Sequence, residues 1–275
     1  MKYAFVLPDL DIATAPGLAA EAEAAGWDAV FIPDGLALET PDFPPSPMSD
    51  PWVTLAAMAM RTTRVQLGPM VAAVTRRRPW KLAREVATLD HLSGGRMILP
   101  VGLGAASDDA GFRETGEAMA LRDRAAILDE TLDILAGLWT GEPFSYEGAH
   151  FHIGRMTQLP PPVQRPRVPV WPVAVAGSTK SMDRALRWDG AVAQGRNAPL
   201  TLADVSAIRE RARERIGDRP FAIVAEGSTP TSDAVAASSA VRAWREAGAT
   251  WWVESRWSAH TTESVRARIQ AGPPR

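Results

Sequence analysis

Three acidic side chains are the candidates for acid–base chemistry in this sequence. Asp34 and Glu226 each follow a short apolar run that predicts a buried strand, and Asp108 comes a few residues after another such run. A carboxylate placed next to a reacting group can act as a general acid or base. We therefore predict Asp34, Asp108 and Glu226 as the catalytic residues, although Asp34 could instead only cap the loop that follows it.

Several other chemistries are disfavoured by what is missing at the ends of the predicted strands. The chain has no cysteine, which excludes a thiolate nucleophile and a zinc–thiolate site. None of its three lysines or four histidines falls at a predicted strand end, where a Schiff-base lysine or a metal-binding histidine cluster would be needed. We therefore expect a bound cofactor to supply the chemistry, and we predict no metal site.

Two turns that contain glycine and hydroxyl residues are candidates for binding a phosphate. Gly177, Ser178 and Thr179 come between a predicted strand and a predicted helix, and a helix N-terminus favours an anion. Residues 227–229 have the same Gly-Ser-Thr sequence after a later strand. Arg196 follows the strand between them and could reach the same phosphate. A Ser or Thr helix cap would use the same residue types.

The elements that would position these residues alternate regularly along the chain. Eight continuous apolar runs, typical of strands covered on both faces, predict strands at residues 3–7, 29–32, 65–71, 97–101, 170–175, 191–193, 221–225 and 250–253. Helices are predicted at residues 16–25, 51–60, 79–92, 122–139, 179–188, 202–216, 232–247 and 261–271. This alternation predicts an α/β fold, a (β/α)8 TIM barrel with its active site at the C-terminal ends of the strands. An open doubly wound sheet is the rival, but the glycine-rich dinucleotide motif is missing after the first strand.

Two adjacent tryptophans test this reading of the strands. Trp251 and Trp252 lie on the last predicted strand, where successive side chains point to opposite faces. We therefore expect one indole in the barrel interior and the other among the helices.

Length and composition are consistent with one barrel. The chain has 275 residues and a net charge of −2, and we predict a single domain over residues 1–275. A segment rich in Pro and Gly, at about 140–169, predicts an insertion between the fourth and fifth strands that forms a lid or a pocket wall. The balanced charge and the lack of a long apolar run argue against nucleic-acid or membrane partners and favour a cytoplasmic protein.

Several segments together resemble the luciferase-like flavin monooxygenases and their deazaflavin (F420)-dependent relatives. The most characteristic are residues 50–57, 64–68 and 89–96, which read DPWVTLAA, RVQLG and LDHLSGGR, and the match spans roughly residues 3–195. The resemblance implies a (β/α)8 barrel with an insertion, a cofactor that is reduced FMN or F420, and a small-molecule substrate. A separate flavin or F420 reductase and a homodimer are the partners it brings into consideration.

The resemblance also assigns residues around the cofactor. It implies a non-proline cis peptide between Met70 and Val71, forming a bulge under the ring. It further implies that the loop from Gly102 to near Asp108 touches the ring, and that residues 177–179 bind the phosphate. The chain departs from many relatives after the second strand, where Asp34-Gly35 replaces Asp-His.

We predict a monooxygenase that uses reduced FMN and O2 on a small organic substrate. Strand ends rich in Trp, Met and Pro, with few titratable groups, suit a site that must hold the ring and exclude water. Three alternatives stay open: hydride transfer with F420, a non-catalytic barrel that binds a flavin or another ligand, and a cofactor-free hydrolase that uses Glu226.

Overall fold

Parallel strands form the barrel that the sequence predicts. The computed structural model describes residues 1–8, 11–36, 48–104, 111–113, 115–257 and 261–275. The barrel strands are β1 (Lys2–Val6), β2 (Ala29–Ile32), β3 (Gln66–Pro69), β4 (Ala72–Ala73), β5 (Leu99–Gly102), β8 (Val170–Val175), β9 (Gly190–Gln194), β10 (Ala222–Gly227) and β11 (Trp251–Glu254). They lie in the order β3-β2-β1-β11-β10-β9-β8-β5-β4, and a parallel bridge from Leu67 of β3 to Met97, just before β5, closes the barrel.

The third strand of the barrel is divided into β3 and β4, so the barrel has eight strand positions within the described residues. Close approach of β3 to the chain entering β5 depends on Gly68, because an added Cβ would lie 2.3 Å from the backbone oxygen of Ile98. Between β3 and β4 the peptide bond from Met70 to Val71 is cis, as predicted.

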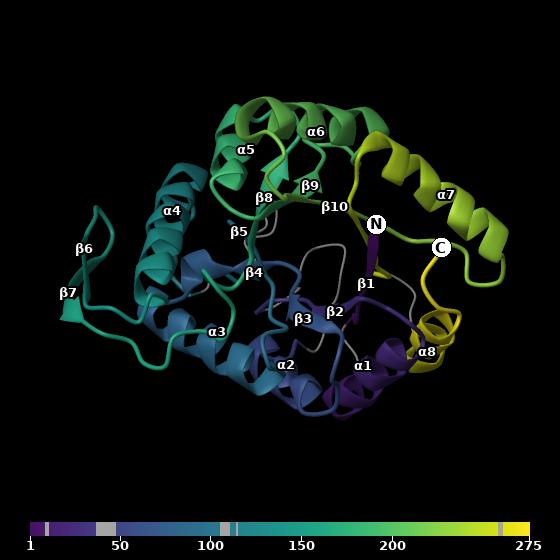
Figure 1. Ribbon diagram of the computed structural model, residues 1–275, viewed down its shortest axis with the longest axis horizontal. Helices are drawn as coiled ribbons and strands as arrows, with labels where there is room; N and C mark the ends of the chain where they lie inside the picture. The colour runs from purple at the N-terminus through teal and green to yellow at the C-terminus, as the bar shows by residue number, and fades with distance from the viewer. Residues whose placement is uncertain (9–10, 37–47, 105–110, 114, 258–260) are drawn as a thin grey trace.

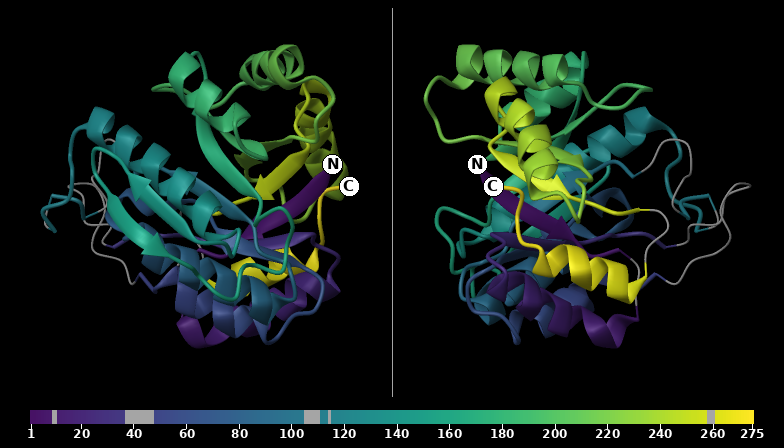
Figure 2. Two further views of the ribbon diagram at one scale, coloured as in Figure 1. Left: turned by 60° about the vertical axis from the view of Figure 1, so that its left-hand side comes forward. Right: turned by 90° about the vertical axis from the view of Figure 1, so that its right-hand side faces the viewer.

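Helices surround the barrel on its outer side (Figure 1, Figure 2). They are α1 (Ala15–Ala24), α2 (Pro51–Ala59), α3 (Pro79–Ser93), α4 (Leu121–Leu138), α5 (Thr179–Leu186), α6 (Leu202–Ile216), α7 (Ala234–Ala247) and α8 (Thr262–Gln270). Local sequence sets several of their starts. Asp50 accepts hydrogen bonds from the backbone N–H groups of Trp52 and Val53 at the start of α2. No helix in the described part of the chain is both long and apolar enough to cross a membrane.

Apolar side chains fill two separate layers, one inside the barrel and one between the barrel and the helices. Trp251 belongs to the inner layer, where its ring centroid lies 5.1 Å from that of Trp171. Trp252 belongs to the outer layer and packs against Trp244 of α7, with 6.1 Å between the ring centroids. The predicted opposite orientation of the two adjacent tryptophans is therefore confirmed.

The segment between α4 and β8 packs on the outside of the molecule. It contains an antiparallel hairpin of β6 (Phe144–Glu147) and β7 (His152–Met156), which lies beyond α4 in Figure 1. The Glu130 carboxylate on α4 accepts hydrogen bonds from the backbone N–H groups of residues 149–151, and the buried Phe151 ring meets Trp80 of α3. Phe151 and Ile153 of this segment are buried, whereas Leu159 and Val163 are exposed. That residues 140–169 form a lid or a pocket wall stays a prediction.

Candidate functional site

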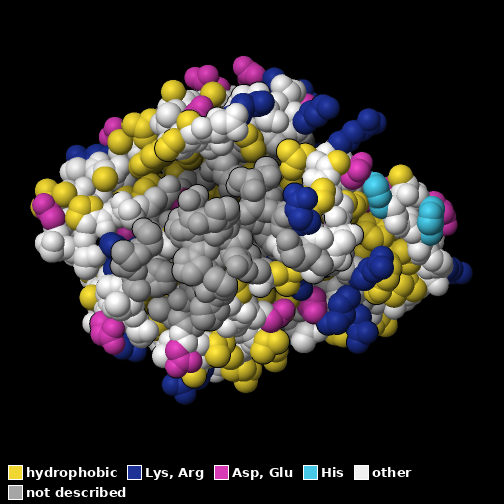
Figure 3. Space-filling model, turned by 180° about the vertical axis from the view of Figure 1, so that it is seen from behind, with side chains coloured by type: hydrophobic (Ala, Val, Ile, Leu, Met, Phe, Trp, Pro, Cys, Tyr) yellow, Lys and Arg dark blue, Asp and Glu magenta, His cyan; other side chains and the backbone are white. Residues whose placement is uncertain are grey.

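A cavity of about 550 Å3 opens at the carboxyl ends of the barrel strands. Side chains that point into the barrel near the ends of the strands line this cavity, among them Val173 and Val175 of β8 and Gln194 of β9. Leu121 and Leu128 of α4 extend its apolar wall outward. Figure 3 shows the molecule from behind, with acidic and basic side chains interspersed among hydrophobic ones.

The bulge between β3 and β4 forms one wall of this cavity. Met70 and Val71 both line it, and the backbone N–H of Met70 donates to the oxygen of Ile32 at 2.7 Å. Gly102 lies beside them at the end of β5. A Cβ on Gly102 would come within 3.3 Å of methyl groups of Val71 and Val173, so glycine lets these two side chains pack closely against the end of β5.

Asp34 lies at the cavity, but its carboxylate is already bound within the protein. The Nη2 atoms of Arg76 and Arg77 contact its Oδ1 at 2.7 and 2.9 Å, and the backbone N–H of Ala73 donates to Oδ2 at 3.1 Å. Only 1% of the Asp34 side chain is exposed. These contacts tie the end of β2 to the segment just after the bulge, so they give Asp34 a positioning role.

Glu226 is the last residue of β10 on the face that points into the barrel, and its hydrogen-bond partner is an aromatic residue. The indole Nε1 of Trp257 donates to the Glu226 Oε1 at 2.6 Å, and Trp257 itself lines the cavity. The hydrogen bond joins the loops after β10 and β11. Asp108, the third predicted catalytic residue, lies outside the described residues.

The predicted phosphate-binding turn is a formed structure at the start of α5. Gly177 has a positive φ of 68°, and the Ser178 side chain accepts from the backbone N–H of Ser181. Arg196 donates from Nη2 to the Gly177 oxygen at 2.9 Å. A smaller cavity of about 200 Å3 is lined by residues 177–179 together with Arg211 of α6. The structure therefore brings the predicted residues together, with Arg196 holding the turn.

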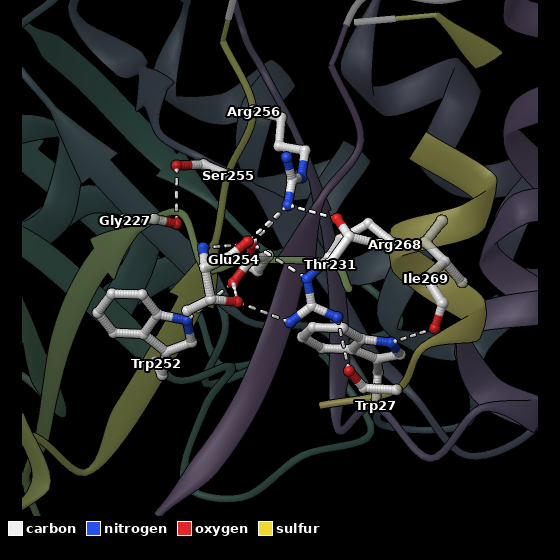
Figure 4. A network of polar contacts seen from close by, with 11 residues as sticks. Trp27, Gly227, Thr231, Trp252, Glu254, Ser255, Arg256, Arg268 and Ile269 are labelled. Carbon is white, nitrogen blue, oxygen red and sulfur yellow. Dashed lines mark hydrogen bonds and ion pairs between the residues drawn. The ribbon is translucent and has the colours of Figure 1, made fainter. Parts of the chain in front are cut away.

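The second candidate turn is not free to bind a phosphate, and this prediction is wrong. The backbone N–H and the hydroxyl of Thr229 each donate to the Glu254 carboxylate at 2.8 Å, so a carboxylate of the protein already takes the place of an anion. Glu254 is fully buried and also contacts Arg268 of α8 (Figure 4). Sequence reasoning missed this cluster. Its signal was the alternation along β11, which places Glu254 on the same outward face as Trp252.

The described residues fit the flavin or deazaflavin cofactor that the sequence resemblance implies. The volume of the larger cavity lies within the range of small-molecule sites, which are mostly apolar with a few polar groups. The Met70–Val71 bulge and Gly102 line this cavity together. The turn at residues 177–179 offers hydroxyl and backbone N–H groups at a helix N-terminus, which suits a phosphate.

Comparisons with known proteins agree with this geometry. The family model described as luciferase-like monooxygenase matches residues 5–272. An uncharacterized protein of Mycobacterium tuberculosis is 32% identical over 196 residues, covering 66% of this chain and 67% of that protein. The F420-dependent glucose-6-phosphate dehydrogenase of Nakamurella multipartita is 34% identical over 179 residues, covering 65% of this chain and 49% of that protein.

Solved structures share the fold at low sequence identity. An F420-dependent secondary alcohol dehydrogenase superposes with a TM-score of 0.80 at 17% identity, covering 99% of this chain and 98% of that one. A monooxygenase from Streptomyces bottropensis superposes with a TM-score of 0.78 at 18% identity, covering 98% and 97%. With the family model matching almost its whole length, the chain belongs to the luciferase-like monooxygenase family.

Proposed function

We propose that the chain is an oxidoreductase that binds reduced FMN and uses O2 to oxygenate a small apolar organic substrate. The observation that carries the proposal is the composition of the cavity wall. Among the described lining residues the one acidic side chain is Asp34, and both of its oxygens are bound to N–H donors of the protein. Most of the other lining side chains are aliphatic or Met. Such a wall suits binding and water exclusion more than proton shuttling.

Each group of residues has a defined task in this proposal. Met70 and Val71 support the ring, and Gly102 lies beside its edge. The turn at residues 177–179 binds the phosphate, and Arg196 keeps that turn in place. Bound reduced FMN would supply the electrons with which O2 is activated. The apolar wall keeps water from the reacting groups. A separate flavin reductase would supply the reduced cofactor, because the sequence shows no nicotinamide-binding motif.

F420-dependent hydride transfer is the second candidate. The relative from Nakamurella multipartita and one of the matching structures are described as F420-dependent enzymes, which favours this cofactor. Hydride transfer calls for a proton donor or acceptor near the ring. Glu226 is the described carboxylate placed to serve, because Trp257 binds its Oε1 and leaves Oε2 available.

Anaerobic titration of the purified protein separates these candidates. FMN and F420, each oxidised and reduced, are added while protein and cofactor fluorescence are followed. Tight binding of reduced FMN, followed by O2 uptake that depends on added organic substrate, supports the monooxygenase. Preference for F420 supports hydride transfer. Saturable binding without turnover of either kind identifies a binding protein. Dissociation constants weaker than about 100 μM for both cofactors contradict the proposal, since that limit corresponds to only about −5.5 kcal/mol.

A further inference from the structure

Three side chains with aromatic or polar groups face the Met70–Val71 bulge from the other side of the barrel. Counting β3 and β4 as one position, the strand order places β10 directly across the ring of eight from the bulge, with β9 and β11 on either side. Gln194 ends β9, Glu226 lies near the end of β10, and Trp257 follows β11. Gln194 and Trp257 line the cavity, and Glu226 is bonded to Trp257.

This side of the cavity offers a flat surface and spare acceptors. The Trp257 side chain is half exposed, although its Nε1 is held by Glu226. No donor among the described residues bonds to the Glu226 Oε2, and the Gln194 side-chain amide likewise has no partner there. The bulge on the other side offers apolar surface from Met70 and Val71. A ligand between the two walls would therefore meet aliphatic groups on one side and an indole with hydrogen-bond acceptors on the other.

The protein holds this wall in place through contacts between two loops. The backbone N–H of Ser255 donates to the Gly227 oxygen at 2.8 Å. The Nη2 of Arg256 donates to the Thr229 oxygen at 2.6 Å and to the Thr231 hydroxyl at 2.9 Å (Figure 4). These bonds join the residues just before Trp257 to those just after Glu226. The loops that carry Glu226 and Trp257 are therefore bonded to each other. The buried Glu254 carboxylate holds the first of these loops in place by accepting a hydrogen bond from Thr229.

We propose that Trp257, Glu226 and Gln194 form the substrate subsite, and that it takes a flat apolar molecule carrying a hydrogen-bond donor, such as a phenol or an aryl amine. An aromatic ring packs well against the indole face. The donor group reaches the Glu226 carboxylate, and a hydrogen bond to a charged acceptor is stronger than one between neutral groups. Trp257 then selects substrates with a flat ring, and Glu226 selects those that carry a hydrogen-bond donor. The inference rests on the proposed function, because it places the ligand beside a ring bound over the bulge.

The test uses phenol and toluene as a matched pair of probes that differ in the donor group. Each is titrated into protein loaded with whichever oxidised cofactor binds, and the visible absorption of the cofactor reports occupancy. In the wild type we expect phenol to bind at least about fivefold more tightly than toluene. Trp257→Ala should weaken both probes about tenfold, and Trp257→Phe should restore most of the affinity. Glu226→Gln should leave toluene unchanged and reduce the preference for phenol about threefold or more.

Controls separate a wrong inference from a wrong function and from misfolding. Trp80→Ala removes a tryptophan on α3 that does not line the cavity, and it should leave the affinity for both probes unchanged. Melting temperatures measured by circular dichroism check that each variant folds. If the wild type binds neither FMN nor F420, the proposed function fails. If a cofactor binds but Trp257→Ala keeps both probe affinities within twofold of the wild type, the substrate subsite is refuted.

Discussion

Replacing Arg268 with methionine should destabilise the protein far more than the same change at Arg266 on the same helix. Arg268 is 2% exposed and its Nε lies 3.2 Å from the Glu254 Oε1, where Glu254 is 0% exposed. Burial lowers the pKa of the Arg268 guanidinium, and the charge of Glu254 opposes that shift. Arg266 instead pairs with Glu21 at 3.0 Å, with both side chains substantially exposed to solvent. The two arginines therefore form a matched pair of variants on α8.

The expected magnitude follows from what each substitution leaves behind. Removing one partner of a buried ion pair costs about 3–5 kcal/mol, because the other charge stays buried without compensation. Here Glu254 would still accept bonds from Thr229 and Trp252, and Arg256 lies 3.6 Å away. We therefore expect the lower end of that range, about 3 kcal/mol, for Arg268→Met. An exposed pair contributes at most about 1 kcal/mol, which bounds the effect of Arg266→Met.

Urea unfolding followed by far-ultraviolet circular dichroism measures both values by linear extrapolation. The double variant Glu254→Leu with Arg268→Met should recover part of the loss, because it leaves neither charge buried. If Arg268→Met falls within about 1 kcal/mol of Arg266→Met, the cluster does not stabilise the fold in the way its burial indicates. The single variants Glu254→Leu and Arg268→Met are measured as well. If the double variant loses as much stability as these two single variants added together, the argument about uncompensated charge is refuted.

Three further predictions concern pH dependence and the cofactor site. Burial alone would raise the pKa of Glu23, but hydrogen bonds from Val65, Arg64 and Thr63 lower this pKa below its ordinary value of 4.5. The ionised Glu23 carboxylate therefore stabilises the fold above pH 4.5, and this stabilisation is lost as the pH falls through the lowered pKa. Glu23→Gln should therefore flatten the acid side of the plot of melting temperature against pH, and an unchanged acid slope would count against this assignment. Gly102→Val should weaken cofactor binding about tenfold or more in a fluorescence titration, because a Cβ already meets two valine methyl groups at 3.3 Å, and full affinity would place the ring elsewhere. Arg196→Gln should weaken FMN about threefold or more while riboflavin affinity stays the same, since only FMN carries the phosphate, and equal losses would contradict the phosphate assignment.

The sequence predicted the barrel because its strands depend on local patterns. Continuous apolar runs identified strands buried on both faces, and alternation along β11 separated Trp251 from Trp252. The cis peptide between Met70 and Val71 followed from the family resemblance and is present. The strands and the alternation can be read from residues that are close together in the chain, whereas the cis peptide was implied only by the resemblance.

Features that depend on long-range partners could not be predicted in the same way. The engagement of Asp34 comes from Arg76 and Arg77, about forty positions along the chain. The loss of the second phosphate turn comes from Glu254, which lies 25 positions beyond Thr229. The outward packing of the β6–β7 hairpin depends on Glu130 and on apolar contacts with α3 and α4. In each case the expectation rested on nearby residues alone, and the contact that changed the outcome comes from a side chain far away in the sequence.

Charged groups around the cavity are arranged so that their charges are paired outside it. Arg184 lines the cavity, yet its Nε and Nη2 bind the Asp129 carboxylate of α4 at 2.6 and 2.8 Å. Asp34 is bound by two arginines, and Glu254 is bound by Arg268 on the outer side of β11. Pairing of this kind lets the barrel end carry many charges while the cavity wall stays largely apolar. In the proposed substrate subsite the donor group of the substrate binds Glu226, so selectivity for that group should depend on this side chain.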